Sequence, residues 1–149
     1  MLRTVLRLAL LAALLSVAPA KAVASPNVHH LSGGGTASIS QVAMNVSVDG
    51  SGSASGSFEC LMAGRSGFVL GDFGLVHNMI VHATPTTGSV DGSVVTFAGT
   101  GRLTLDGSQH LAIHVQVRAD VAAQSFQLTV VEVGTLPIET LLSGHIAMS

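Results

Sequence analysis

Two histidines four residues apart are the residues of this sequence whose type and spacing most readily suggest chemistry. They are His110 and His114, within the apolar, β-branched segment QHLAIHVQV at 109–117. On a β-strand, side chains alternate between the two faces, so residues four apart project from the same face. Their Cα atoms would lie about 13 Å apart at roughly 3.3 Å per residue, too far for both rings to bind one ion. We therefore expect both rings on the solvent-facing side of a strand.

A metal site assembled from several strands is a second interpretation. Zinc and copper sites need three or four ligands that converge at about 2 Å, commonly histidines and carboxylates. The candidate ligands are His77, His110, His114 and His145. If neighbouring strands bring His77 or His145 beside His114, the chain is a metal-dependent enzyme with a histidine cluster at the mouth of a barrel. No spacing in the sequence requires this arrangement.

The sequence assigns no catalytic residue and no cofactor. It contains no G-x-S-x-G nucleophile elbow, although HHLSGGG resembles the glycine run of a lipase oxyanion hole. The single cysteine, Cys60, lies in the segment SFECLMA and is expected to be a buried small hydrophobe. A nucleophile and an intermolecular disulfide are the alternatives for this thiol.

The segments that carry these side chains have the sequence pattern of β-strands. Apolar residues alternate with polar ones in QVAMNVSV (41–48) and LAIHVQV (111–117), a period of two that is typical of strands wet on one face. We expect strands at about 28–32, 36–48 (with a break near Ser40), 55–63, 76–83, 93–98, 101–106, 109–118, 125–133 and 141–148. The alternation changes phase at Val131, which predicts a bulge or a stretch covered on both sides.

Turn sequences separate these segments. The tripeptide DGS occurs at 49–51, 91–93 and 106–108, and Asp-Gly suits the positive backbone angles of tight hairpins. The aspartates of these turns are expected to serve the backbone rather than catalysis. Longer connections are expected at PTTG (85–88) and at GTLPIET (134–140), where one helical turn could form.

The N-terminal segment has the three-part layout of a secretory signal peptide, which predicts a signal helix followed by one domain. Arg3 and Arg7 precede an uncharged apolar stretch at 8–18, and small-residue pairs follow it. We expect cleavage after Ala24, with Ala20 as the second choice. The domains are then a signal peptide at 1–24 and a single β-barrel domain at 25–149, and the protein is secreted or periplasmic with no membrane span after cleavage.

Charge and composition restrict the partners of residues 25–149. Three arginines remain there against eight acidic residues, a formal net charge of −5. Such a surface is a poor partner for phosphate backbones, so nucleic-acid binding is excluded as a function class. The chain has no Trp or Tyr and only five Phe, which disfavours carbohydrate binding because sugars commonly stack on aromatic rings.

Together these patterns predict an all-β fold: a single antiparallel β-barrel, or a closed sandwich, of about eight strands. The segments HLSGGGTASI, SGSF, VVTFAGTG, FQLTV and LLSGHIAM follow one another in an order that resembles small secreted bacterial β-barrel domains of the post-COAP type. The resemblance covers most of residues 25–149, although the chain lacks the Tyr-containing strand common in such domains. It implies a barrel in which the Gly-rich first strand and the last strand lie together, and it supplies no catalytic residues.

The main functional hypothesis is a non-catalytic secreted β-barrel that either holds a small apolar ligand or acts as a structural or adhesion module. An eight-stranded barrel has an interior that side chains can fill or that one ligand can occupy. The residues expected to face inward are Val42, Met44, Val46, Val48, Leu111, Ile113, Val115, Val117, Phe126 and Leu128. The metal-dependent enzyme is the alternative, and a third hypothesis is assembly through an exposed strand edge, with the oligomeric state left open.

Overall fold

The computed structural model describes residues 27–64 and 77–149, and these residues form strands and no helix. The strands are β1 (His29–Ala37), β2 (Gln41–Val48), β3 (Ala54–Met62), β4 (Met79–Asp91), β5 (Val94–Leu105), β6 (Gln109–Asp120), β7 (Ser125–Val130), β8 (Gly134–Thr135) and β9 (Glu139–Met148). The predicted signal helix and its cleavage positions lie outside the described residues.

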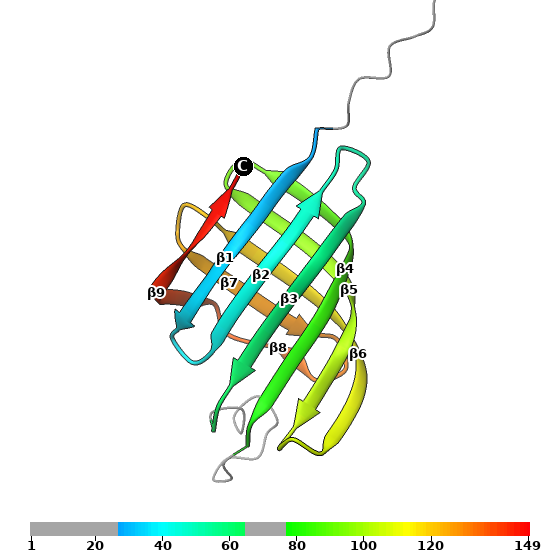
Figure 1. The fold of residues 1–149 in the computed structure, drawn as a ribbon, viewed down its shortest axis with the longest axis vertical. Helices are drawn as coiled ribbons and strands as arrows, with labels where there is room; N and C mark the ends of the chain where they lie inside the picture. The colour runs from blue at the N-terminus through cyan, green and yellow to red at the C-terminus, as the bar shows by residue number, and fades with distance from the viewer. Residues whose placement is uncertain (1–26, 65–76) are drawn as a thin grey trace, which may run out of the picture.

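All the strands belong to one antiparallel sheet that closes on itself. The order of neighbours is β6-β5-β4-β3-β2-β1-β9-β7-β8, and β6 also pairs with β7. In Figure 1, β1, β2 and β3 lie side by side in front, and β6 and β7 continue the ring behind them. The predicted all-β, antiparallel, closed architecture is therefore confirmed.

The first and last strands lie together, as expected. β1 pairs with β9 from Leu31–Met148 to Ala37–Leu141. The register shifts near Thr36, which leaves Leu142 as the extra residue of a β-bulge. The ring is completed on the far side of β9, where β7 pairs with it at two positions.

The predicted break between residues 98 and 101 is wrong, because β5 runs unbroken through this segment. Gly99 lies opposite Pro85 of β4, and a Cβ atom on Gly99 would meet the Thr84 carbonyl oxygen. This glycine therefore permits close approach of two backbones and makes no turn. PTTG (85–88) is likewise part of β4, with a register shift at Pro85, where proline is tolerated because the ladder is already irregular.

The break expected near Ser40 is confirmed, since β1 ends at Ala37 and β2 begins at Gln41. The expected first strand at 28–32 is too short, because β1 continues to Ala37. Two other element predictions are corrected. The phase change at Val131 is neither a bulge nor a doubly covered stretch, because β7 ends at Val130 and a turn follows. The segment at 134–140 contains β8 and the start of β9 and no helical turn.

Turns form at the three DGS segments as predicted, and the positive backbone angle at both Asp and Gly is found in one of them. In the turn between β5 and β6, Asp106 and Gly107 have φ of 48° and 73°, the sign that a type I′ turn requires at both central positions. Asp49 Oδ1 accepts hydrogen bonds from the backbone N–H groups of Ser51 (2.8 Å) and Ser53 (3.0 Å). The Asp49 carboxylate therefore serves the backbone of its own turn, as expected from the sequence.

The core fills the ring. Its centre holds Phe58, whose ring lies edge-on to those of Phe97 (5.8 Å between centroids) and Phe126 (6.4 Å). All three rings are about 1% exposed. The predicted inward set is buried except for Leu111, which is 50% exposed. β7 pairs with β6 only from Val115 onward, and Leu111 lies four residues beyond that pairing, whereas Ile113, two residues beyond it, is still buried.

Candidate functional site

The two histidines of β6 contact neighbouring side chains through Nδ1. On β6, the rings of His110 and His114 are both exposed, as predicted. His110 Nδ1 lies 3.1 Å from Thr104 Oγ1 on the adjacent strand. His114 Nδ1 lies 2.7 Å from Glu132 Oε1, and the same carboxylate accepts the backbone N–H of His114. The two histidines thus have different partners and do not share a site.

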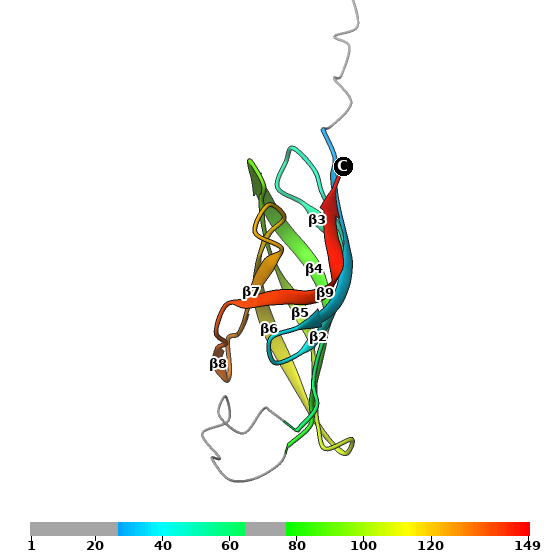
Figure 2. The same cartoon turned by 90° about the vertical axis from the view of Figure 1, so that its left-hand side faces the viewer.

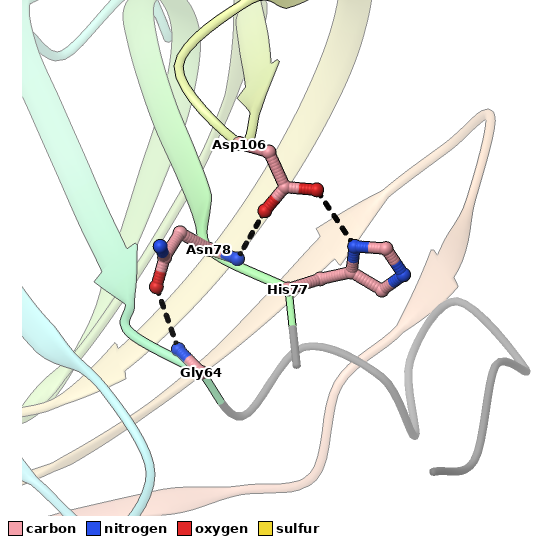
Figure 3. Close-up of polar contacts among 4 residues, drawn as sticks. All are labelled: Gly64, His77, Asn78 and Asp106. Atoms are coloured by element: carbon pink, nitrogen blue, oxygen red, sulfur yellow. Dashed lines mark hydrogen bonds and ion pairs between the residues drawn. The ribbon is translucent and has the colours of Figure 1, made fainter. Parts of the chain in front are cut away.

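His77 and Asp106 form a second imidazole–carboxylate pair at one end of the ring (Figure 3). His77 Nδ1 lies 2.7 Å from Asp106 Oδ2, while the other carboxylate oxygen accepts the backbone N–H of Asn78 at 2.9 Å. The Asn78 side chain in turn accepts the N–H of Gly64 at 2.8 Å. The Asn78 N–H, and after it the His77 ring, lower the pKa of the Asp106 carboxyl from 3.8. This network fastens the β5–β6 turn to the beginning of β4.

A third pair lies in the middle of the outer face. His82 Nδ1 lies 3.2 Å from Glu59 Oε2, and Arg102 follows on the next strand in the same row. Two surface depressions of about 420 and 340 Å³ flank Glu59. Their hydrogen-bonding walls include Gln41, Ser143, Asn45, Ser57 and Thr84. This area is an open, polar part of the outer face.

The four candidate metal ligands occupy separate places. His145 lies on β9 opposite Gly34, and β9 is not a neighbour of β6, so it does not lie beside His114. His77 is paired with Asp106 at the end of the ring. Within residues 27–64 and 77–149, no three His, Cys, Asp or Glu side chains gather in a way that could hold a metal ion.

A buried polar cluster joins three strands inside the ring. Glu139, at the start of β9, is 1% exposed and accepts hydrogen bonds from the Ser40 hydroxyl (2.8 and 3.0 Å) and the Ile39 N–H (3.0 Å). Cys60 of β3 is fully buried beside Ser40. Burial raises the pKa of the Cys60 thiol to about 12, so the nucleophilic thiolate is not populated at neutral pH. The buried small-hydrophobe interpretation of Cys60 fits this position.

Comparisons with protein-family models, with curated proteins and with solved structures return no match. In the part of the chain that the structure describes, no helix has the length and apolar character needed to cross a membrane.

Sequence reasoning missed the partners of these side chains. It placed Asp106 in a turn but did not link it to His77, and it found no partner for Glu132 or Glu139. Each pair joins residues from 18 to 99 positions apart, so only the strand register brings them together. An acidic residue close to the end of a strand, as Glu132 lies after β7 and Glu139 begins β9, is the weak signal that the sequence contained.

Proposed function

We propose that the chain is a secreted, non-catalytic structural or adhesion module that acts through its outer surface. The observation that carries the proposal is the contact of three phenylalanine rings, Phe58, Phe97 and Phe126, at the centre of the ring of strands. A barrel of about eight strands has room for its own side chains or for one small ligand. Filling the centre with aromatic rings favours the structural version of the hypothesis over the ligand-carrying one.

The chemistry of the reactive groups supports the same proposal. Cys60 is buried and keeps its proton, Glu139 is used to hold the turn between β1 and β2, and Asp106 and Glu132 are engaged by histidines and backbone N–H groups. These groups serve the fold in the geometry described. Export is supported by the layout of residues 1–24, and the resemblance to post-COAP-type domains stays a prediction.

Native mass spectrometry of the purified protein tests the filled interior. We expect the mass of the polypeptide alone, and a stoichiometric apolar molecule would overturn the proposal in favour of ligand carriage. The variant Phe58→Ala provides a positive control, because removing the whole ring leaves a cavity of the size that a small apolar probe such as benzene can enter. The wild-type protein is expected not to bind that probe.

Two further measurements test the remaining parts of the proposal. N-terminal sequencing of the exported protein is expected to begin at Ser25, and retention of residues 1–24 would contradict export by a cleaved signal.

Elemental analysis after reloading with zinc or copper is expected to find substoichiometric metal. One retained equivalent, lost together with His77 or His114, would support the enzyme alternative instead.

A further inference from the structure

The edge of β9 that faces away from β1 has little strand pairing. β7 pairs with this edge at two rungs, Ser125–Thr140 and Phe126–Glu139. Beyond them, β9 leaves β7 and continues along β1 to Met148 (Figure 2). Among the described residues, no strand pairs with this edge between Leu142 and Met148. An unpaired edge offers N–H and C=O groups with which another strand can pair.

The hydrogen-bond pattern identifies the groups that face this edge. His30 of β1 and Ser149 exchange both of their backbone hydrogen bonds, at 2.8 and 3.0 Å. Residues of an antiparallel ladder turn both backbone groups alternately towards one neighbour and the other. Since Ser149 bonds to β1, the residues Met148, Ile146 and Gly144 turn their N–H and C=O groups towards the free edge.

The side chain of Gln124 occupies the middle position of this edge. Its Nε2 donates to the carbonyl oxygen of Ile146 at 2.9 Å, and its Oε1 accepts the N–H of Ile146 at 2.9 Å. The amide therefore makes both bonds that a neighbouring strand would make. Its Nε2 also donates to the Val121 carbonyl at 2.6 Å, and its own carbonyl accepts the Leu141 N–H at 2.9 Å.

We infer that the β9 edge is a self-association site, at which β9 of a second copy pairs antiparallel once the Gln124 amide is displaced from Ile146. The two-fold arrangement centred on Ile146 places Ile146 opposite its own copy and Gly144 opposite Met148 of the other chain. Every edge-facing group named above then has a backbone partner. Each chain contributes the same strand, β9, to the interface, as two-fold symmetry requires.

The sequence of β9 favours a second copy as the occupant. Between Thr140 and Ser149 the chain has no Asp, Glu, Lys or Arg, so antiparallel self-pairing opposes no like charges. Edge strands are commonly protected by lysine, proline or an inward charge, and this segment has none of these. In this protein the Gln124 side chain covers the edge instead of such a residue. This inference adds a partner to the proposed module and does not depend on whether the interior is filled.

The variant Gln124→Ala tests the inference through the oligomeric state. To form the dimer, the wild-type protein must break the hydrogen bonds of the Gln124 side-chain amide in each chain. The alanine variant has no such bonds to break. The amide makes two hydrogen bonds to Ile146 in each chain, four in the dimer, and at about 1 kcal/mol per bond we expect the dimer dissociation constant of Gln124→Ala to be about 1,000-fold lower than that of the wild type. Analytical ultracentrifugation over a concentration series measures this constant. Gln116→Ala, on the exposed face of β6, is the matched control and is expected to behave as the wild type.

A second variant shows whether β9 is the interface. Met148→Pro removes an N–H that faces the free edge and no hydrogen bond to β1, so the monomer is expected to keep its fold. The double variant Gln124→Ala/Met148→Pro is expected to return to the monomer, with circular dichroism confirming the native sheet. In the Gln124→Ala dimer, the amides of Gly144 and Met148 should gain protection from hydrogen exchange. An unchanged dissociation constant in Gln124→Ala, or a dimer that persists in the double variant, would overturn the inference.

Discussion

The hydroxyl of Ser40 and the carboxylate of Glu139 hold the turn between β1 and β2 against the first residue of β9. Ser40 donates to both carboxylate oxygens, at 2.8 and 3.0 Å, and both side chains are almost completely buried. The Ile39 N–H donates to the same carboxylate. A buried carboxylate is tolerated only where such donors replace water. The pair therefore specifies how the last strand enters the ring.

Replacing this carboxylate should destabilise the protein strongly. In Glu139→Ala, the buried Ser40 hydroxyl and the partly buried Ile39 N–H lose their acceptor, so we expect a loss of about 2 to 4 kcal/mol in the free energy of unfolding. Glu139→Gln keeps one acceptor oxygen and should lose about half as much. Urea unfolding measures these changes. A Glu139→Ala variant within about 0.5 kcal/mol of the wild type, the range of ordinary surface substitutions, would show that the cluster does not hold the fold together.

The Cys60 thiol should be unreactive in the folded protein. It is fully buried and its pKa is raised to about 12, so alkylation by iodoacetamide at neutral pH requires opening of the sheet. We expect the labelling rate to follow the rate or extent of unfolding as urea is increased, measured by mass spectrometry. The small peptide GSFECLMA, with an exposed thiol, is the control for intrinsic reactivity. Labelling of the native protein as fast as the peptide would support the nucleophile interpretation of Cys60.

Gly34 should be required by the pairing of β1 with β2. A Cβ atom at this position would meet the Val42 carbonyl oxygen and come within 2.9 Å of the Ala43 Cα, both of which are backbone atoms that cannot turn away. Gly34→Ala is expected to lower the free energy of unfolding by about 2 to 3 kcal/mol, as overpacked sites do. Gly50→Ala is the matched control, because its new methyl group would come no closer than 3.9 Å to the Asn27 backbone. Equal melting temperatures for the two variants would contradict the argument.

The alternation of side chains was sufficient to predict most of the fold. It identified the strands around Val46 and Val115, their inner faces, and the turns at Asp49 and Asp106, because these depend on neighbours within a few residues. The role of a glycine could not be predicted, because a short stretch of sequence does not distinguish a glycine in a turn from one in a closely packed strand. The GTG segment around Gly99 looks like a turn in the sequence, yet its glycines admit a neighbouring strand, and the sequence does not say which strand that is.

The polar pairs could not be predicted, because they depend on register between distant strands. Ser40 and Glu139 are 99 residues apart, and His77 and Asp106 are 29 apart. A shift of one residue between two strands would turn one member of each pair to the opposite face. Leu111 shows a related limit, because the alternation predicts that it is in the core, yet it is 50% exposed near the end of β6 while Ile113 on the same face is buried.

The His77–Asp106 network gives the protein a stability that depends on pH. The Asn78 N–H and the His77 ring lower the pKa of Asp106 in the folded state, so the unfolded chain binds a proton at this carboxyl more readily. Stability from this group is therefore fully present above the unfolded value near 3.8 and is lost as pH falls from there through the lowered folded pKa. Asp49, Asp120 and Glu132 have pKa values shifted in the same direction and add to the acid sensitivity.

Asp106→Asn isolates this contribution. Asparagine tolerates the positive φ of residue 106, so the turn is kept while the charge is removed. We expect the urea midpoint of the variant to lie below that of the wild type at pH 6 and the gap to close as pH falls below about 3.8, the unfolded value. Asp91→Asn, in the DGS turn between β4 and β5, is the matched control and should leave the midpoint nearly unchanged across this range. A gap between Asp106→Asn and the wild type that is the same at pH 6 and pH 3 would show that the carboxylate charge is not what fastens the turn to β4.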